Sequence, residues 1–120
     1  MTKNTLVIGA STNKERYSYR VIKKLLNNNH KVYALGKKKE IIHDVIIHPN
    51  FKIFNSIHTI TLYISPKIQK NYFDYVLKLN PERVIFNPGT ENFYFANLLT
   101  KNSINWENSC TLVLLSTNQY

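Results

Sequence analysis

The stretch Thr5-Leu6-Val7-Ile8-Gly9-Ala10-Ser11 decides the fold that this sequence predicts. Its first four residues form a short apolar run, which is typical of a strand buried on both faces. Gly9 and the small residues after it predict a turn at the end of that strand. Because glycine lets the backbone approach a ligand closely, this turn could cradle a diphosphate at the start of the next helix. The stretch is neither GxGxxG nor a Walker A loop, and a glycine after a strand is also an ordinary turn.

Outward from this strand, apolar strands and amphipathic helices alternate along the chain. Apolar residues at helical spacing follow Ser18, which we expect to be an N-cap, and the asparagines 27–29 should end that helix. Residues 37–57 read as irregular, with a short strand near 51–54. The remaining expected strands cover 31–35, 59–64, 83–86 and 104–107, and the remaining expected helices cover about 66–79, 91–101 and a short docking segment over 110–116.

This alternation predicts an α/β protein with a doubly wound parallel sheet, Rossmann-like and built in three layers, α/β/α. No linker or repeat interrupts the chain, so we expect one domain over 1–120. In such folds ligands bind beyond the carboxyl ends of the strands, near the switch in strand order. The residues directly after each strand are therefore the candidate site.

Basic side chains follow the first two strands. Arg16 and Arg20 flank the first helix, and the guanidinium fork suits phosphate, although a solvated helix start is an equal interpretation. After the second strand comes Gly36 and then the three lysines 37–39. Dinucleotide enzymes usually carry an acid there for the ribose, and no acid precedes Glu40. The lysines therefore argue against NAD and for a ribose that carries a phosphate, with a solvated loop as the alternative.

The charge and composition narrow the class of protein. Sixteen Lys+Arg against 7 Asp+Glu give a formal net charge of +9, which attracts polyanions such as nucleic acid, acidic lipid or a ligand with several phosphates. The abundance of Asn, Lys and Ile, typical of an AT-rich genome, accounts for part of this charge. Most aromatic residues fall on apolar stripes, so we do not expect them to stack on nucleic acid.

Cysteine and histidine usage excludes two further classes. One Cys and 4 scattered His give neither a disulfide framework nor a metal site. No apolar run approaches the roughly 20 residues of a membrane helix. The first residues lead straight into a strand, so we expect a cytoplasmic protein without a signal peptide.

Four motifs together resemble the small, single-domain CoA-binding proteins. They are Gly9-Ala10-Ser11 with Asn13, the segment 15–20 with Arg-Tyr-Ser, the segment 87–92 with Asn-Pro-Gly, and 110–113 with its Cys. The likeness spans almost the whole chain. The family shares the Rossmann-like module found at the start of the succinyl-CoA synthetase α subunit. The chain departs from many relatives after the second strand, where it has Leu35-Gly36-Lys37 and not Asn-Pro.

The resemblance implies a site for CoA or an acyl-CoA. The first loop would hold the diphosphate, the loop after the second strand the adenosine and 3′-phosphate, and the segment 87–92 the pantetheine side. The lysines could compensate for the departure, since CoA carries about four negative charges at neutral pH. The expected binding residues are Gly9, Ala10, Ser11, Thr12, Asn13, Arg16, Tyr17, Arg20, Gly36, Lys37, Lys38, Ser65, Pro66, Asn87, Pro88, Gly89, Thr90, Glu91, Asn92 and Cys110.

We predict no catalytic group, because no nucleophile stands beside an evident base. Glu91 at a helix start favours a capping role over that of a base. Cys110 is either a buried structural thiol or faces the thiol of CoA, where a mixed disulfide is a hypothesis. We therefore expect a non-catalytic or regulatory CoA-binding module. Two alternatives stay open, an NAD(P)-binding oxidoreductase or redox-sensing domain and a basic nucleic-acid-binding protein, as does assembly with a second copy or a protein partner.

Overall fold

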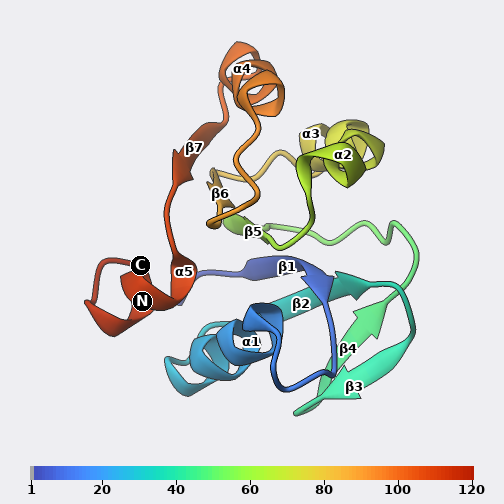
Figure 1. The fold of residues 1–120 in the computed structure, drawn as a ribbon, viewed down its shortest axis with the longest axis vertical. Helices are drawn as coiled ribbons and strands as arrows, with labels where there is room; N and C mark the ends of the chain where they lie inside the picture. Colours follow the sequence, from blue (N-terminus) through green and yellow to red (C-terminus); the bar gives the residue numbers. More distant parts are fainter. Residues whose placement is uncertain (1) are drawn as a thin grey trace.

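A seven-stranded sheet with helices on both faces forms the body of the protein (Figure 1), in a computed structural model that describes residues 2–120. The strand order is β3-β4-β2-β1-β5-β6-β7. All neighbouring strands are parallel except β3 and β4. The strands are β1 (Thr5–Ala10), β2 (Val32–Gly36), β3 (Glu40–Ile42), β4 (Val45–His48), β5 (Thr59–Leu62), β6 (Arg83–Phe86) and β7 (Asn105–Asn108). The helices are α1 (Tyr17–Asn27), α2 (Pro66–Gln69), the 3-10 turn η1 (Lys70–Tyr72), α3 (Phe73–Leu79), α4 (Phe93–Lys101) and α5 (Thr111–Ser116).

The predicted three-layer α/β fold is confirmed by the way the sheet buries both faces. Leu6 and Ile8 of β1 pack with the core under α3 and α4, which includes Phe95. Val7 points the other way and packs with α1 and α5, which contribute Ile22 and Leu115. This alternation places α1 and α5 on one face and the other helices on the opposite face (Figure 1).

The expected helix ends at residues 27–29 and after residue 79 are confirmed, whereas two of the expected helix starts are wrong. Asn29 (φ 64°) and Asn80 (φ 48°) adopt the left-handed conformation that ends a helix. Arg16, not Ser18, is the N-cap of α1, because Ser18 turns inward and is 2% exposed. The helix expected from residue 91 begins at Phe93, after an Asn92 side chain that accepts the hydrogen bond from the amide of Phe95.

The segment after β2 is more regular than predicted. β3 and β4 form an antiparallel hairpin in which Ile41 lies opposite Ile46. The two turn residues, His43 and Asp44, both have positive φ (44° and 71°), as a tight hairpin turn requires. No strand forms over 51–54; Phe51 instead stacks on Tyr75 at 5.0 Å between ring centroids.

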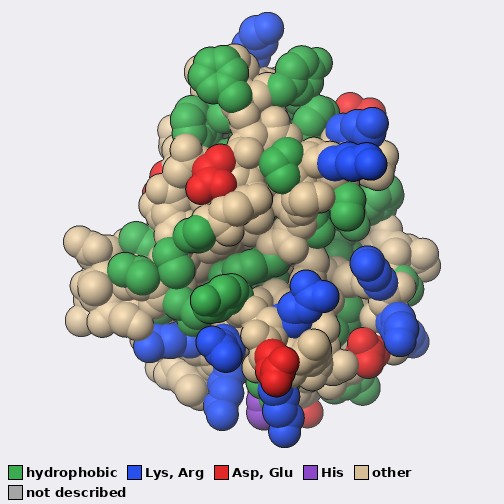
Figure 2. Space-filling view, in the orientation of Figure 1, with side chains coloured by type: hydrophobic (Ala, Val, Ile, Leu, Met, Phe, Trp, Pro, Cys, Tyr) green, Lys and Arg blue, Asp and Glu red, His purple; other side chains and the backbone are tan. Residues whose placement is uncertain are grey.

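Charge is unevenly spread over the surface. On the face in Figure 2, Lys and Arg side chains gather over the lower half, around α1 and the β3–β4 hairpin, with a few acidic side chains among them. Hydrophobic side chains gather over α4 at the top of this view. Within residues 2–120 no helix combines the length and the apolar character needed to cross a membrane.

Candidate functional site at the carboxyl edge of the sheet

The sheet order brings the predicted site residues to one edge. β1 lies between β2 and β5, so the strand order switches beside it, where α/β folds bind ligands. Across the sheet, the predicted groups follow β2, β1, β5, β6 and β7 in that order, as 36–38, 9–13, 65–66, 87–92 and 110. Strands lie about 4.8 Å apart, so these groups span about 19 Å. A ligand that reaches all of them must be elongated.

Gly9 allows the loop after β1 to pass against the loop after β5. Its φ is +94°, and a Cβ at this position would lie 2.6 Å from the carbonyl oxygen of Tyr63. Both facts require glycine. In the same loop after β5, the amide of Tyr63 donates a hydrogen bond to the carbonyl oxygen of Ile8 at 2.8 Å. The start of the site is thus fixed by backbone contacts between adjacent strands.

The loop after β1 presents free main-chain donors. Asn13 shapes it, because its amide donates to Ser11 Oγ (3.1 Å) and its side-chain oxygen accepts from the amide of Glu15 (3.0 Å). The amides of Ser11, Thr12 and Lys14 have no acceptor in the described part of the chain. Amides exposed in a turn before a helix bind anions, so this loop fits a diphosphate.

The start of α1 adds positive charge to the same loop. Arg16 and Tyr17 are exposed, and the guanidinium of Arg20 lies over the Tyr17 ring at 5.5 Å from its centroid. The first turn of α1 holds no acidic residue. The helix dipole and the two arginines therefore act in the same direction on an anion in the loop.

β2 ends directly against the first loop. A Cβ on Gly36 would lie 2.4 Å from the carbonyl oxygen of Ala10, so the two strand ends touch there. Lys37 and Lys38 follow, both exposed, and neither forms a salt bridge with any residue from 2 to 120. Their charges are available to a ligand.

Glu40 is absent from the predicted site, yet it contacts the first loop. The hydroxyl of Thr12 donates to Glu40 Oε2 at 2.9 Å. Glu40 begins β3, and the hairpin with β4 folds it back to this edge. The available signal was its place as the first acid after β2, but the hairpin that returns it to the loop was not predicted.

A buried glutamine joins the loops after β5 and β6. The Gln69 side chain donates to the carbonyl oxygens of Ile64 (2.9 Å) and Thr90 (2.7 Å) and accepts from Asn92 Nδ2 (3.0 Å). The predicted residues 65–66 stand exposed in front of it at the start of α2. Gln69 was not predicted, because its role depends on two loops that are distant in sequence.

Asn87 serves the fold at the end of β6. Its side chain donates to Thr61 Oγ1 (2.7 Å) and the Leu62 carbonyl oxygen (2.9 Å), and it accepts from the amide of Thr111 (2.9 Å). The hydroxyl of Thr90 in turn donates to the Asn87 carbonyl oxygen (2.7 Å). The structure therefore places these two predicted side chains inside the protein, where they hold three elements together.

The turn after Asn87 is exposed. Gly89 has φ +90°, and a Cβ on it would meet no atom within 4 Å. Its amide donates to Glu91 Oε1 at 2.8 Å, so the Glu91 carboxylate closes this turn. Pro88 stands exposed beside them. The Glu91 carboxylate thus caps this turn and not the helix α4, whose N-cap is Asn92.

Cys110 follows β7 as a free, half-buried thiol at the N-cap of α5. It lies near Tyr63, whose pKa is raised far above its ordinary 10, mainly because burial disfavours the phenolate. Tyr63 is therefore protonated at neutral pH and is no base for the thiol. In residues 2–120 no group of three or more His, Cys, Asp or Glu side chains could hold a metal ion.

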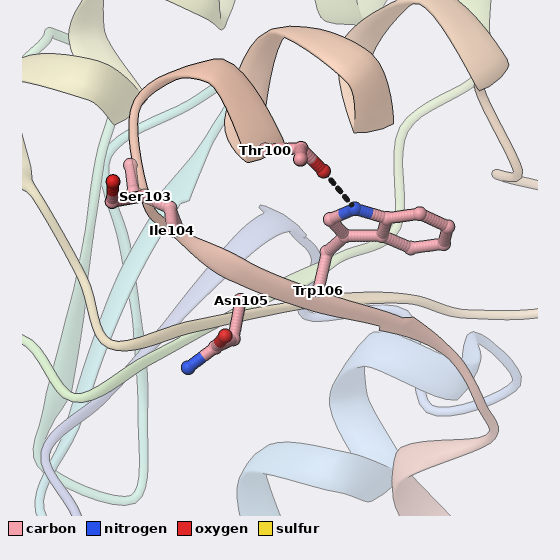
Figure 3. A pocket seen from close by; sticks show the side chains of 5 residues that line it. All are labelled: Thr100, Ser103, Ile104, Asn105 and Trp106. Carbon is pink, nitrogen blue, oxygen red and sulfur yellow. Dashed lines mark hydrogen bonds between the residues drawn. The ribbon is translucent and has the colours of Figure 1, made fainter.

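Two cavities lie beside Trp106. The larger, about 340 Å³, is lined by Thr100, Ser103, Ile104, Asn105 and Trp106 (Figure 3). Trp106 Nε1 donates to Thr100 Oγ1 at 2.9 Å, and no predicted residue lies there. The smaller, about 280 Å³, is at the carboxyl edge, where it contains two predicted residues; its lining is Glu91, Asn92, Phe93, Ala96, Trp106 and Asn108.

A protein-family model described as a CoA binding domain matches residues 3–116. The chain belongs to this family. The expected resemblance to CoA-binding proteins is thereby confirmed over nearly the whole sequence.

Solved structures show that this CoA-binding domain shares its fold with other proteins. An uncharacterized protein is 37% identical, with a TM-score of 0.97 over 100% of this chain and 99% of its own. A hypothetical protein from Pyrococcus horikoshii OT3 is 24% identical, with a TM-score of 0.88 over 97% and 83%. A dinucleotide-forming acetyl-coenzyme A synthetase from Ca. Korarchaeum cryptofilum, solved with phosphate and ADP, is 12% identical, with a TM-score of 0.75 over 89% of this chain and 25% of its own. No curated protein matches the sequence.

Proposed function

We propose that this domain binds CoA or an acyl-CoA along the carboxyl edge of its sheet, with the diphosphate at the loop after β1. The observation that carries this proposal is the set of three amides, those of Ser11, Thr12 and Lys14, that have no acceptor in residues 2–120. Arg16 stands beside them at the start of α1. Oriented amides at a helix start stabilise an anion without any cost of reorganisation.

The rest of the rim suits the other parts of CoA. Lys37 and Lys38, exposed at the end of β2, would attract the 3′-phosphate. In the opposite direction, the pantetheine arm would cross the ends of β5 and β6 toward Cys110 or toward the cavity beside Phe93. Both ends of an elongated nucleotide thioester would be contacted over the roughly 19 Å between β2 and β7.

The domain would act as a carrier or regulatory module. Bound CoA would supply a thiol or thioester, and the chain would supply orientation and charge. The half-buried Cys110 has a protonated Tyr63 near it and not a base, which favours binding over catalysis. A part of an acetyl-coenzyme A synthetase with the same fold is consistent with a module that can also work within a larger enzyme.

Calorimetry with CoA, dephospho-CoA and NAD tests the proposal. We expect CoA to bind most tightly, dephospho-CoA less tightly because Lys37 and Lys38 lose their anion, and NAD least. Arg16→Gln should weaken CoA binding, whereas Lys101→Gln, at the far end of α4, should not.

Equal affinity for all three nucleotides would contradict the proposal, and tighter binding of NADPH than of CoA would favour an oxidoreductase. Binding of duplex DNA that survives about 0.2 M salt would favour the nucleic-acid alternative.

Native mass spectrometry of the freshly purified protein gives an independent answer. A co-purified mass equal to that of CoA or an acyl-CoA would identify the ligand and its acyl group. A different resident nucleotide would overturn the proposal.

A further inference from the structure

Opposite charges meet where β2 ends, beside the loop after β1. Lys37 and Lys38 project into solvent without a salt bridge to any described residue. Glu40 is half-buried, and its carboxylate accepts a hydrogen bond from Thr12 at 2.9 Å. Thr12 belongs to the loop whose free amides are the proposed diphosphate site. The carboxylate is thus tethered to that site, while the two ammonium groups are exposed and have no acidic partner among the described residues.

A tethered carboxylate and exposed ammonium groups recognise different parts of a phosphorylated ribose. A carboxylate accepts hydrogen bonds from ribose hydroxyls and repels a phosphate placed next to it. An ammonium group attracts a phosphate and is tolerant of its position. In α/β nucleotide sites an acid near the end of the second strand accepts the 2′-hydroxyl. Glu40 reaches this place by a hairpin and not directly from the strand.

We propose that Glu40 is a specificity-determining residue that accepts the free 2′-hydroxyl of a 3′-phosphorylated adenosine and excludes a 2′-phosphate. Lys37 and Lys38 hold the 3′-phosphate on the solvent side. The tether to Thr12 fixes the carboxylate, so the discrimination comes from position and not from net charge. This inference rests on the proposed function, because it requires a nucleotide whose diphosphate lies in the loop after β1.

Two isomeric probes isolate this effect. Adenosine 3′,5′-bisphosphate and adenosine 2′,5′-bisphosphate have the same atoms and the same charge, so long-range attraction to a basic protein treats them alike. We expect the wild-type protein to bind the 3′,5′ isomer roughly tenfold or more tightly than the 2′,5′ isomer, since a site that pairs a hydroxyl rejects a ligand that lacks it. Calorimetric titration of both probes, with CoA as reference, gives this ratio.

Variants then assign the ratio to Glu40. Glu40→Gln can still accept the bond from Thr12, so the fold should hold, but it removes the charge that repels a 2′-phosphate. We expect it to tighten binding of the 2′,5′ isomer and to bring the ratio to roughly threefold or less. Thr12→Val, which removes the tether and keeps the charge, should also lower the ratio. Glu15→Gln is the matched control, because Glu15 is an exposed acid before α1 whose side chain forms no hydrogen bond or salt bridge in the described residues.

The outcomes separate this inference from the proposed function. A retained ratio in Glu15→Gln with a collapsed ratio in Glu40→Gln supports the inference. Equal wild-type affinity for the two isomers, or an equal collapse in Glu15→Gln, overturns it even when CoA binds tightly. Failure of the wild-type protein to bind CoA and both bisphosphates overturns the proposed function, and the inference with it.

Discussion

The side-chain amide of Asn87 donates a 2.7 Å hydrogen bond to the hydroxyl of Thr61, which joins the end of β6 to β5. That hydroxyl lies 2.9 Å from the hydroxyl of Thr111 at the start of α5. All three residues are buried. A polar network without access to water is stable only when its members have partners, so this one fixes the strand ends that carry the proposed site.

Replacement of Asn87 with Ala should destabilise the protein strongly. It removes three hydrogen bonds and leaves the Leu62 carbonyl oxygen and the Thr111 amide without their partner. We expect the free energy of unfolding to fall by about 2–4 kcal/mol. Urea denaturation measures this change. Asn97→Ala, at an exposed position of α4, is the control and should change stability by less than about 0.5 kcal/mol. Similar losses in both variants would refute the structural role of Asn87.

Alanine substitutions at two glycines with nearly equal φ distinguish the cost of a strained backbone from the cost of a steric clash. Gly9 (φ +94°) would place a Cβ 2.6 Å from the Tyr63 carbonyl oxygen, whereas Gly89 (φ +90°) would place it in open space. Gly89→Ala should therefore lower the free energy of unfolding by only about 1–2 kcal/mol, which is the cost of a positive φ for alanine. Gly9→Ala should lower the free energy of unfolding by about 1–3 kcal/mol more than Gly89→Ala, because the adjacent loop must also move to make room for the Cβ. Thermal and urea unfolding of both variants test this order, and equal losses would contradict it.

Stability should fall as the pH drops below neutral, in part through His30. The pKa of His30 lies below its ordinary 6.5, first because of burial and then because of nearby Lys3. The unfolded chain therefore takes up the proton first, so stability present above pH 6.5 is lost as the pH falls through the lower pKa of the folded state. Protonation also ends the 3.0 Å bond from the Lys3 amide to His30 Nδ1.

The pH effect can be assigned by substitution. The melting temperature of the wild-type protein should fall between about pH 7 and about pH 5. His30→Gln should reduce this fall, although His48 and His58, whose pKa values burial also lowers, still contribute. An identical pH profile in His30→Gln and in the wild type would count against the assignment.

We expect Lys37 and Lys38, after β2, to strengthen CoA binding through its 3′-phosphate. The double variant Lys37→Gln/Lys38→Gln should weaken CoA binding by roughly tenfold, equal to about 1.4 kcal/mol, and should hardly change dephospho-CoA binding. Lys23→Gln/Lys101→Gln makes the same change in net charge at exposed positions of α1 and α4. Isothermal calorimetry compares the two. Equal weakening by both double variants would show that the lysines act only through net charge.

The parallel body of the sheet was predictable because its strands are apolar runs bounded by turn residues. The strand expected at 83–86 matches β6, and the one expected at 104–107 lies one residue from β7. The hairpin β3–β4 was not predictable from turn chemistry, because its turn residues, His43 and Asp44, adopt positive φ without a glycine. The N-cap prediction at Ser18 was wrong, because the preference of serine for N-caps does not reveal that this side chain is buried against the core.

The candidate site was predictable as a set of strand ends and not as a set of contacts. The order of strands requires Gly9, Gly36 and Gly89 to lie at one edge, and the structure places them there. The bond between Thr12 and Glu40 joins residues 28 positions apart through an unpredicted hairpin. Such pairings depend on loop paths that local sequence patterns do not encode.

The hydrogen bonds of Gln69 couple the loop after β5 to the loop after β6. A ligand that displaced α2 would also displace the backbone of Thr90 and the side chain of Asn92, the N-cap of α4, because the buried Gln69 side chain forms hydrogen bonds with both. A displacement of the loop after β5 would thus be transmitted through Gln69 to the loop after β6, and the aromatic residues Phe93 and Tyr94 at the start of α4 would move with it.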